Sequence, residues 1–284
     1  MSYQIITDSC CDFTDRQYKD LGVACAPLSV LFQGQARDNM NDPAELKKFY
    51  DGIRGGEMPT TSAVNPDGWV RIMNPILDAG EDVLCLAFSS GLSTTYQSAV
   101  IAAREMEEVY PQRTIRVVDT LCAALGQGLL VYLACRKRDA GMSLDDLTAW
   151  VEDHKLNIAH WVTVDDLNHL KRGGRISATT AFFGGMLNIK PIIHVDDEGH
   201  LINVGKARGR KASMDILLSK FKETCTDTDT VFIGHGDCPE DAAVLEKALK
   251  ELGVSNVVTG YVGGVIGAHT GPGVLVLFFV ASQR

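Results

Sequence analysis

The sequence lacks the marks of a membrane-spanning or secreted protein. Its longest apolar run, over Val274–Val280 and its neighbours, is too short to cross a bilayer. The first residues lead directly into a strand-like run, without the basic segment of a signal peptide. The eight cysteines are scattered, with no Cys-x-x-Cys pair and no Cys/His cluster at zinc spacing. We therefore expect a cytoplasmic chain with no stable membrane insertion, no metal ion and reduced cysteines that mostly fill the core.

Motifs for nucleotide binding and for common catalysis are also missing. The glycine-rich stretch Gly263–Gly273 is followed by a strand rather than a helix, so it does not fit the dinucleotide fingerprint. There is no Walker A sequence, no Gly-x-Ser-x-Gly and no His-Glu-x-x-His. A trio of Ser93, His269 and Asp8 is conceivable, but any chain of this length offers one. We expect no cofactor and no catalytic residue, and the net charge of −9 argues against nucleic acid as a partner.

What is present is an ordinary globular composition with an α/β pattern. The 284 residues are 45% hydrophobic and 22% charged, which suits a chain of two domains. Strands alternate with helices in the first half, which predicts a mainly parallel sheet. Adjacent strands in the second half predict a mixed sheet. The expected fold is two α/β domains, residues 1–158 and 159–284, with a ligand site between them.

The predicted elements follow apolar periodicity, caps and glycines. Strands are expected over 3–7, 26–32, 83–88, 114–118, 160–164, 189–195, 201–207, 230–235, 256–261 and 274–280. Helices are expected over 15–21, 43–53, 66–79, 96–106, 121–139, 144–157, 165–170, 177–187, 211–223 and 239–252. Loops are expected over 58–66, which holds Thr60, Thr61 and Ser62, and over 263–273, which holds His269 and Thr270.

One stretch organises the rest of the chain: a buried strand over 83–88, a turn rich in hydroxyls, and a helix. The turn holds five hydroxyl side chains in seven residues, namely Ser89, Ser90, Ser93, Thr94 and Thr95. A helix start has free N–H groups and a partial positive charge, and Gly91 permits a guest to approach closely. The stretch is therefore a candidate site for a carboxylate or phosphate. The simpler alternative is that Ser93 or Thr94 only caps the helix.

A basic block is the second unusual feature. Residues 171–211 carry a net charge of +5, while the rest of the chain carries −14. The two glycines between Arg172 and Arg175 indicate a shaped turn, where an arginine can meet a phosphate or a partner's carboxylate. A solvated face is the simpler reading. Apolar side chains near the loops, among them Phe182, Phe183, Met186 and Leu187, are candidates for core or for the lining of an apolar slot.

Taken together, the motifs resemble the DegV family, the bacterial fatty-acid-binding proteins that include the FakB subunits of fatty acid kinase. The resemblance spans nearly the whole chain. It rests on Thr7-Asp-Ser with Asp12, Thr61-Ser62, Ser89–Ser93 with Thr95–Ala99, Leu170–Ile176, Ile189–Ile192, Lys206–Ala212 and Gly267–Gly273.

The resemblance implies two α/β domains with a fatty acid between them. It implies that Thr61, with Ser62 beside it, and Ser93, with Thr94 beside it, bind the carboxylate, and that His269 and Thr270 lie near the head group. It implies that Arg172, in a basic region with Arg175 and Arg208, serves phosphoryl transfer or docking of a separate ATP-dependent kinase. The protein would then be a carrier of the acyl phosphate, not an enzyme by itself.

Two departures from the family pattern touch the head-group loops. Thr94 follows the binding serine where the family usually has glycine, and Ala63-Val64 follows Thr-Ser where it often has Gln-Pro. Two rival functions remain: an enzyme acting on a phosphosugar, because the Ser/Thr turn loosely resembles those of sugar isomerases, and an interaction protein docked through the basic block. An apolar tunnel would favour the carrier, a polar cup the isomerase, and a filled core the docking module.

Overall fold

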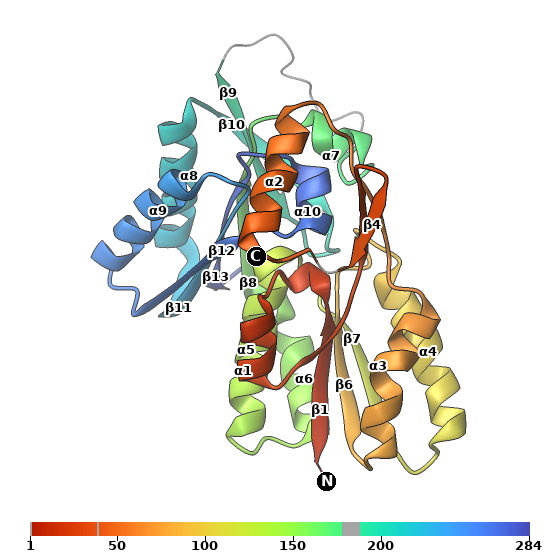
Figure 1. The fold of residues 1–284 in the computed structure, drawn as a ribbon. Helices are drawn as coiled ribbons and strands as arrows, with labels where there is room; N and C mark the ends of the chain where they lie inside the picture. Colours follow the sequence, from red (N-terminus) through yellow and green to blue (C-terminus); the bar gives the residue numbers. More distant parts are fainter. Residues whose placement is uncertain (1, 39, 178–187) are drawn as a thin grey trace.

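The structure is a computed structural model, which describes residues 2–38, 40–177 and 188–284. The helix expected over 177–187, with Phe182, Phe183, Met186 and Leu187, therefore lies outside the described residues except for Ser177. The described part contains a four-stranded, a three-stranded and a six-stranded sheet, with helices packed on and between them (Figure 1).

The first half is built on a parallel sheet, as predicted. Its order is β2-β1-β6-β7, and all its pairings are parallel. The strands are β1 (Tyr3–Asp8), β2 (Ala24–Ala26), β6 (Asp82–Ala87) and β7 (Ile115–Asp119). Every residue of β6 is buried, as expected for an apolar central strand covered on both faces.

A small antiparallel sheet, β4-β3-β5, was not predicted. Its strands are β3 (Ser29–Phe32), β4 (Gln35–Asp38) and β5 (Thr60–Ser62). The single strand expected over 26–32 is wrong, because the chain leaves the parallel sheet at Ala26 and enters this second sheet at Ser29. The loop expected around Thr61 is also wrong there: Thr61 pairs with Val30. Three-residue strands give too short an alternation to be read from sequence.

The second half contains the predicted mixed sheet, in the order β10-β9-β8-β13-β11-β12. Its strands are β8 (Ile158–Thr163), β9 (Ile189–Val195), β10 (Leu201–Arg208), β11 (Cys225–His235), β12 (Asn256–Tyr261) and β13 (Leu275–Ala281). Among the described strands of this sheet, only β11 and β12 pair in parallel. The division of the chain into domains of residues 1–158 and 159–284 stays a prediction.

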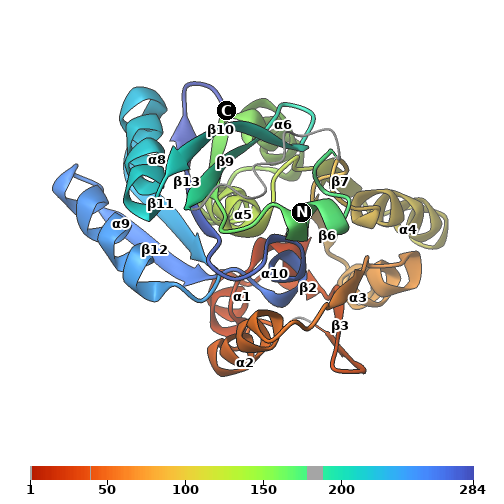
Figure 2. The same ribbon diagram turned by 90° about the horizontal axis from the view of Figure 1, so that it is seen from above.

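Helices cover both large sheets and one helix lies between them. The helices and 3₁₀ turns are α1 (Asp15–Leu21), α2 (Pro43–Arg54), α3 (Pro66–Asp78), α4 (Thr95–Val109), α5 (Ala124–Asp139), α6 (Leu144–His154), α7 (Asn168–Arg172), α8 (Arg210–Thr224), α9 (Pro239–Glu251), α10 (Gly264–Thr270), η1 (Ser9–Cys11) and η2 (Lys155–Asn157). Helices α3 and α4 pack on one face of the parallel sheet, and α8 and α9 on the outer face of the mixed sheet (Figure 2).

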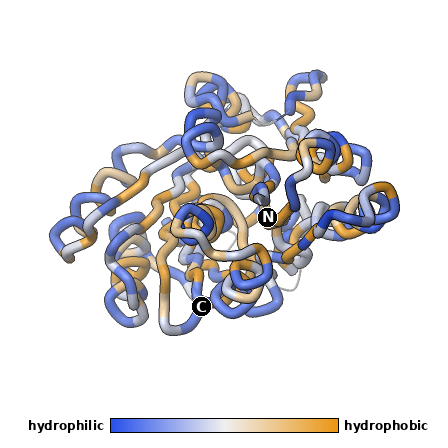
Figure 3. Tube along the Cα trace, turned by 90° about the horizontal axis from the view of Figure 1, so that it is seen from below, coloured by the Kyte–Doolittle hydropathy of each residue, from blue (hydrophilic) through white to orange (hydrophobic). Residues whose placement is uncertain are grey.

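Helix α5 joins the two halves into one core. It contacts η1 on one side and strands β8, β11 and β13 on the other. Its first eight residues are all buried, because a helix between two sheets has apolar neighbours on every side. Peripheral helices instead alternate hydrophilic and hydrophobic positions (Figure 3). The helix begins at Ala124 rather than at the predicted Leu121, because Thr120 and Asp119 hold the preceding turn by side-chain bonds to backbone N–H groups.

Two further predictions concern the glycine loop and the cysteines. The loop over 263–273 is wrong in part, because residues 264–270 form helix α10, in contact with α2, α7, β3 and β5 (Figure 1). All eight cysteines are free and five are buried, which confirms the expected core role. Adjacent Cys10 and Cys11 are buried thiols in η1. Among the described residues, no helix is long and apolar enough to span a membrane.

Candidate functional site

The hydroxyl-rich turn between β6 and α4 does not act as one cluster. Ser89 and Thr95 are buried, and the Ser89 hydroxyl donates to the Gly199 carbonyl at 2.9 Å. The Thr94 side chain makes no capping hydrogen bond. Ser93 Oγ instead accepts from the Thr95 backbone N–H at 3.2 Å and lies 2.9 Å from Thr95 Oγ1. Ser90, Ser93 and Thr94 remain facing the cavity described below.

Gly91 has a different role from the one expected. A Cβ atom there would lie 2.8 Å from the Gly199 carbonyl oxygen and 2.9 Å from that of Glu198. The glycine thus permits close approach of the turn between β9 and β10, not of a guest molecule. The prediction that Gly91 opens the anion site to a ligand is wrong.

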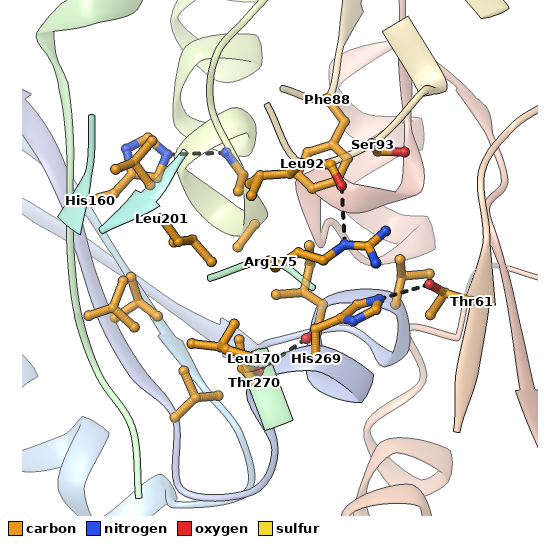
Figure 4. Close-up of a pocket in the computed structure, with 18 of the residues that line it drawn as sticks. Thr61, Phe88, Leu92, Ser93, His160, Leu170, Arg175, Leu201, His269 and Thr270 are labelled. Carbon is orange, nitrogen blue, oxygen red and sulfur yellow. Dashed lines mark hydrogen bonds between the residues drawn. The ribbon is translucent and has the colours of Figure 1, made fainter. Parts of the chain in front are cut away.

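A cavity of about 430 Å³ lies between the two halves of the molecule (Figure 4), within the usual range of about 300–1,000 Å³ for ligand sites. Polar side chains gather at one end, on β5, the β6–α4 turn, the segment after α7, and α10. They are Thr61, Ser93, Thr94, Arg175, His269 and Thr270. Most of the other described lining is apolar and comes from α5, β8, β9, β10 and β13, for example Ala124, Val162, Ile193, Leu201 and Phe278.

Thr61 and His269 form the centre of the polar end. Thr61 Oγ1 lies 2.8 Å from His269 Nε2, although 208 positions separate the two residues. Burial, and secondarily the charge of Arg175, lowers the pKa of His269 to about 4. The imidazole is therefore neutral near pH 7 and carries one N–H. This side chain lies in the last turn of helix α10, not on a loop as predicted.

Arg175 is a positively charged residue in the cavity wall. Its Nε donates to the Leu92 carbonyl at 3.2 Å, and Nη1 donates to the Gly173 carbonyl. These bonds fix the guanidinium beside His269 (Figure 4). Gly173 is required for this packing, because a Cβ atom there would lie 2.2 Å from His269 Nδ1. The Gly-Gly turn thus brings α7 against α10.

A second depression of about 340 Å³ adjoins the cavity and shares Thr61, Arg175 and His269 with it. Arg172 and His169 line this depression, and Arg172 Nη2 lies 2.9 Å from His169 Nδ1. Burial, and then the charge of Arg172, lowers the pKa of His169.

Two of the candidate residues lie elsewhere. Ser62 is exposed and lines neither space, because it follows Thr61 in a strand and adjacent side chains point to opposite faces. Arg208 is exposed at the end of β10 and also lines neither. The basic block does not form one charged face: Lys190 pairs with Asp165 at 2.7 Å and Arg210 with Asp241 at 2.7 Å.

Asp8 supports the site, although the sequence alone suggested only a possible trio with Ser93 and His269. Its carboxylate accepts from the Phe88 N–H at 2.7 Å, from the Cys10 N–H at 3.0 Å and from Gln127 Nε2 at 3.3 Å. Burial raises its pKa to about 6, against the effect of these donors. Asp8 thus fixes the strand end from which the hydroxyl turn starts, and it does not form a trio with Ser93 and His269. The sequence feature that could have indicated this supporting role is the position of Asp8 directly after the strand predicted over 3–7.

His160 was not predicted to be a site residue, yet it lines the cavity at the end opposite Thr61 (Figure 4). Its Nε2 accepts from the Ala123 N–H at 3.2 Å and its Nδ1 lies 2.8 Å from the Ile158 carbonyl. Burial lowers its pKa well below the usual value. The ring is neutral and both nitrogens have partners. Among the described residues, no group of three or more His, Cys, Asp or Glu side chains is arranged to hold a metal ion.

Comparison with known proteins gives one consistent family. A family model described as an uncharacterised protein of the DegV family matches residues 2–282. A DegV domain-containing protein of Clostridium perfringens is 42% identical over 286 residues, covering 99% of this chain and 98% of that relative.

Solved structures agree with this family. A DegV family protein of Thermus thermophilus, described by its fatty acid binding, has a TM-score of 0.87 and 30% identity, covering 99% of this chain and 100% of its own. A fatty acid (stearic acid)-binding protein of Eubacterium ventriosum has a TM-score of 0.87 and 25% identity, with 98% of each chain covered. The α/β fold described above is therefore the fold of these proteins.

Proposed function

Because the chain belongs to the DegV family, we propose that it binds a long-chain fatty acid in the cavity between its two halves. It presents the carboxylate to a separate ATP-dependent fatty acid kinase, and it then carries the acyl phosphate. The observation that carries this proposal is the division of one cavity into a polar end and an apolar remainder.

The apolar remainder supplies most of the binding free energy. Each buried methylene is worth about 0.8 kcal/mol, so some fifteen of them contribute roughly 12 kcal/mol before the costs of association. A charge-assisted hydrogen bond adds about 1.5–3 kcal/mol. The acyl tail therefore dominates affinity, and the polar end decides which end of the ligand faces outward.

The polar end holds a carboxylate with mostly neutral donors. Thr61, Ser93 and Thr94 offer hydroxyls. In the tautomer with its N–H on Nε2, neutral His269 donates to Thr61 Oγ1, and the Thr61 hydroxyl is then free to donate to the ligand. Arg175 supplies a positive charge, while its Nε and Nη1 already donate hydrogen bonds to backbone carbonyls. Such a site orients the carboxylate without burying a tight ion pair, which suits a ligand that must be modified and released.

The adjoining depression is the natural place for the added phosphoryl group. It begins at the same three residues, Thr61, Arg175 and His269, and it continues to Arg172. An arginine there can bind a phosphate through two parallel N–H groups. We assign Arg172 to the phosphoryl group or to the kinase, and Arg208, exposed on β10, to docking of the kinase.

The two rival functions fit less well. A phosphosugar isomerase needs a polar cup, whereas the described lining is mainly aliphatic and aromatic. A pure docking module has a filled core, whereas this protein has a cavity of about 430 Å³. Both observations favour the carrier.

Native mass spectrometry of the purified protein, followed by solvent extraction, tests lipid binding. A released long-chain fatty acid supports the proposal. A protein that stays ligand-free after incubation with a series of fatty acids contradicts it.

The kinase role has its own test, with Ser93→Ala and the exposed control Ser255→Ala. Phosphorylation of the bound fatty acid by a fatty acid kinase should fall more than lipid binding does in Ser93→Ala, and neither should change in the control. Equal loss of both activities would refute this division between head group and tail.

A further inference from the structure

The hairpin of β9 and β10 forms part of the cavity wall on the side opposite Thr61. Val195, the last residue of β9, and Leu201, the first of β10, are register partners and both line the cavity. The turn between them is closed by hydrogen bonds from Asp196 N–H to His200 O at 2.9 Å and from Gly199 N–H to Asp196 O at 3.0 Å. In Figure 4, Leu201 and His160 lie on the side of the cavity opposite Thr61.

This hairpin is fastened to the rest of the molecule at its turn. The buried Ser89 hydroxyl donates to the Gly199 carbonyl at 2.9 Å, and Gly91 packs against the same peptide. On the other side, Arg284 Nη1 donates to the Asp196 carbonyl at 3.0 Å. The hairpin is therefore a fixed wall, held by contacts from two distant parts of the sequence.

The loop of residues 89–94 contacts both the hairpin turn and the polar end of the cavity. Its first part holds the hairpin turn through Ser89 and Gly91, and its last part lines the polar end with Ser93 and Thr94. The Leu92 and Ser93 N–H groups both donate to the Ser89 carbonyl at 3.1 Å, so these contacts are made by one compact turn. The head-group site and the tail wall are thus tied to one short segment.

We propose that the β9–β10 hairpin, held by the 89–94 loop, limits the length of the acyl chain, with Leu201 and Val195 as the residues that meet its methyl end. This inference rests on the proposed function and deepens it. The surroundings suit a methyl group, since His160 there is neutral and uses both ring nitrogens in hydrogen bonds.

A wall predicts a break in the dependence of affinity on chain length. Each methylene that finds room should raise affinity about fourfold, which corresponds to about 0.8 kcal/mol. Once the methyl end reaches the hairpin, further methylenes should add nothing or lower affinity. The break marks the longest chain that fits.

The first test measures dissociation constants for saturated fatty acids of ten to twenty carbons with wild type, Leu201→Ala and Leu201→Phe. The break should move to chains longer by one to three carbons in Leu201→Ala and to shorter chains in Leu201→Phe. Ile202→Ala is the matched control, because Ile202 is the next residue of β10, exposed on its other face. Its break should not move.

The second test loosens the wall without touching its lining. A Cβ atom at Gly199 would lie 2.1 Å from Ser89 Oγ and 3.2 Å from Leu121, so Gly199→Ala should push the hairpin outward. Gly253→Ala is its control, with a similar positive φ and nothing near its Cβ position. Ser89→Ala is a milder variant that removes the hydrogen bond to the Gly199 carbonyl and the one that Ser89 Oγ accepts from the Gly91 N–H at 3.2 Å. The break in affinity against chain length should become shallower in Gly199→Ala and in Ser89→Ala, but not in the control Gly253→Ala.

The outcomes separate the two proposals. An unmoved break in both Leu201 variants, with fatty acids still bound, overturns the hairpin as the length limit and leaves the carrier function standing. A wild-type protein that binds none of the fatty acids overturns the proposed function itself. Should Gly199→Ala fail to fold, Ser89→Ala and the Leu201 variants still decide the question.

Discussion

Replacing Thr61 by valine tests the head-group site most directly. Valine keeps the shape of the side chain and removes its hydroxyl, so the 2.8 Å contact with His269 Nε2 is lost together with a donor to the ligand carboxylate. In the ligand-bound protein the proposed chain of donors runs from His269 to Thr61 to the carboxylate. The substitution interrupts this chain at its middle.

The expected magnitude differs between charged and uncharged lipids. A hydrogen bond to a charged group is worth about 1.5–3 kcal/mol and one between neutral groups about 0.5–1.5 kcal/mol. Thr61→Val should therefore weaken binding of a fatty acid about ten- to a hundredfold, and binding of the matching fatty alcohol only about two- to tenfold. The fourfold gain per methylene should be unchanged, because the tail contacts other residues.

The assay is calorimetric titration with acids and alcohols of fourteen, sixteen and eighteen carbons. Thr228→Val serves as the control, because Thr228 is an exposed residue on β11 that lines neither space. Equal loss for acids and alcohols would refute the reasoning, since it would mean that Thr61 contributes shape and not charge recognition. A changed slope with chain length would refute the separation of head from tail.

Three further predictions concern pH and packing. The pKa of His269 is about 4 in the folded protein and 6.5 ordinarily, so between these values the unfolded state binds one proton that the folded state does not. The free energy of unfolding of the ligand-free protein should therefore rise by up to about 3 kcal/mol from pH 4 to 6.5, relative to that of His269→Gln. Urea unfolding measures this, and the same pH dependence in wild type and His269→Gln would contradict it. Asp8 has the opposite effect, because its pKa is raised from 3.8 to about 6 and the folded state binds the extra proton. Between pH 4 and 6 the free energy of unfolding of the wild type should fall by up to about 3 kcal/mol relative to that of Asp8→Asn. A rise over this range would contradict the prediction. Gly173→Ala must displace His269, whose Nδ1 would lie 2.2 Å from the new Cβ atom. Fatty acid affinity should then fall about tenfold, because the hydrogen bond between His269 and Thr61, worth about 1.4 kcal/mol, is lost. Unchanged affinity in a titration would show that His269 is not needed.

Much of the fold was determined by local sequence. Caps, glycines and apolar periodicity placed the main helices and strands. Helix α1, for example, begins with a full capping box of Thr14 and Gln17. The alternation of strands and helices indicated the parallel sheet, and adjacent strands indicated the mixed one. These features depend on neighbours within a few residues, so they can be read along the chain.

The motifs also placed most of the candidate site. Thr61, Ser93, Thr94, Arg175, His269 and Thr270 came from separate strings in the sequence, and the structure brings them to one end of one cavity. These six residues were predicted from the resemblance to a known family. The residue types alone left the helix cap and the anion site as alternatives for the hydroxyl turn.

Only the tertiary structure decided what each of these residues touches. Strand β5 and helix α10 were predicted as loops, because a short strand and a glycine-rich helix owe their existence to packing against α2, α7 and β3 rather than to local propensity. Gly91 and Ser89 seemed free for a ligand, yet they hold the β9–β10 turn more than a hundred positions away. The cavity and its length exist only where the two halves meet across α5, and such contacts leave no periodic trace in the sequence.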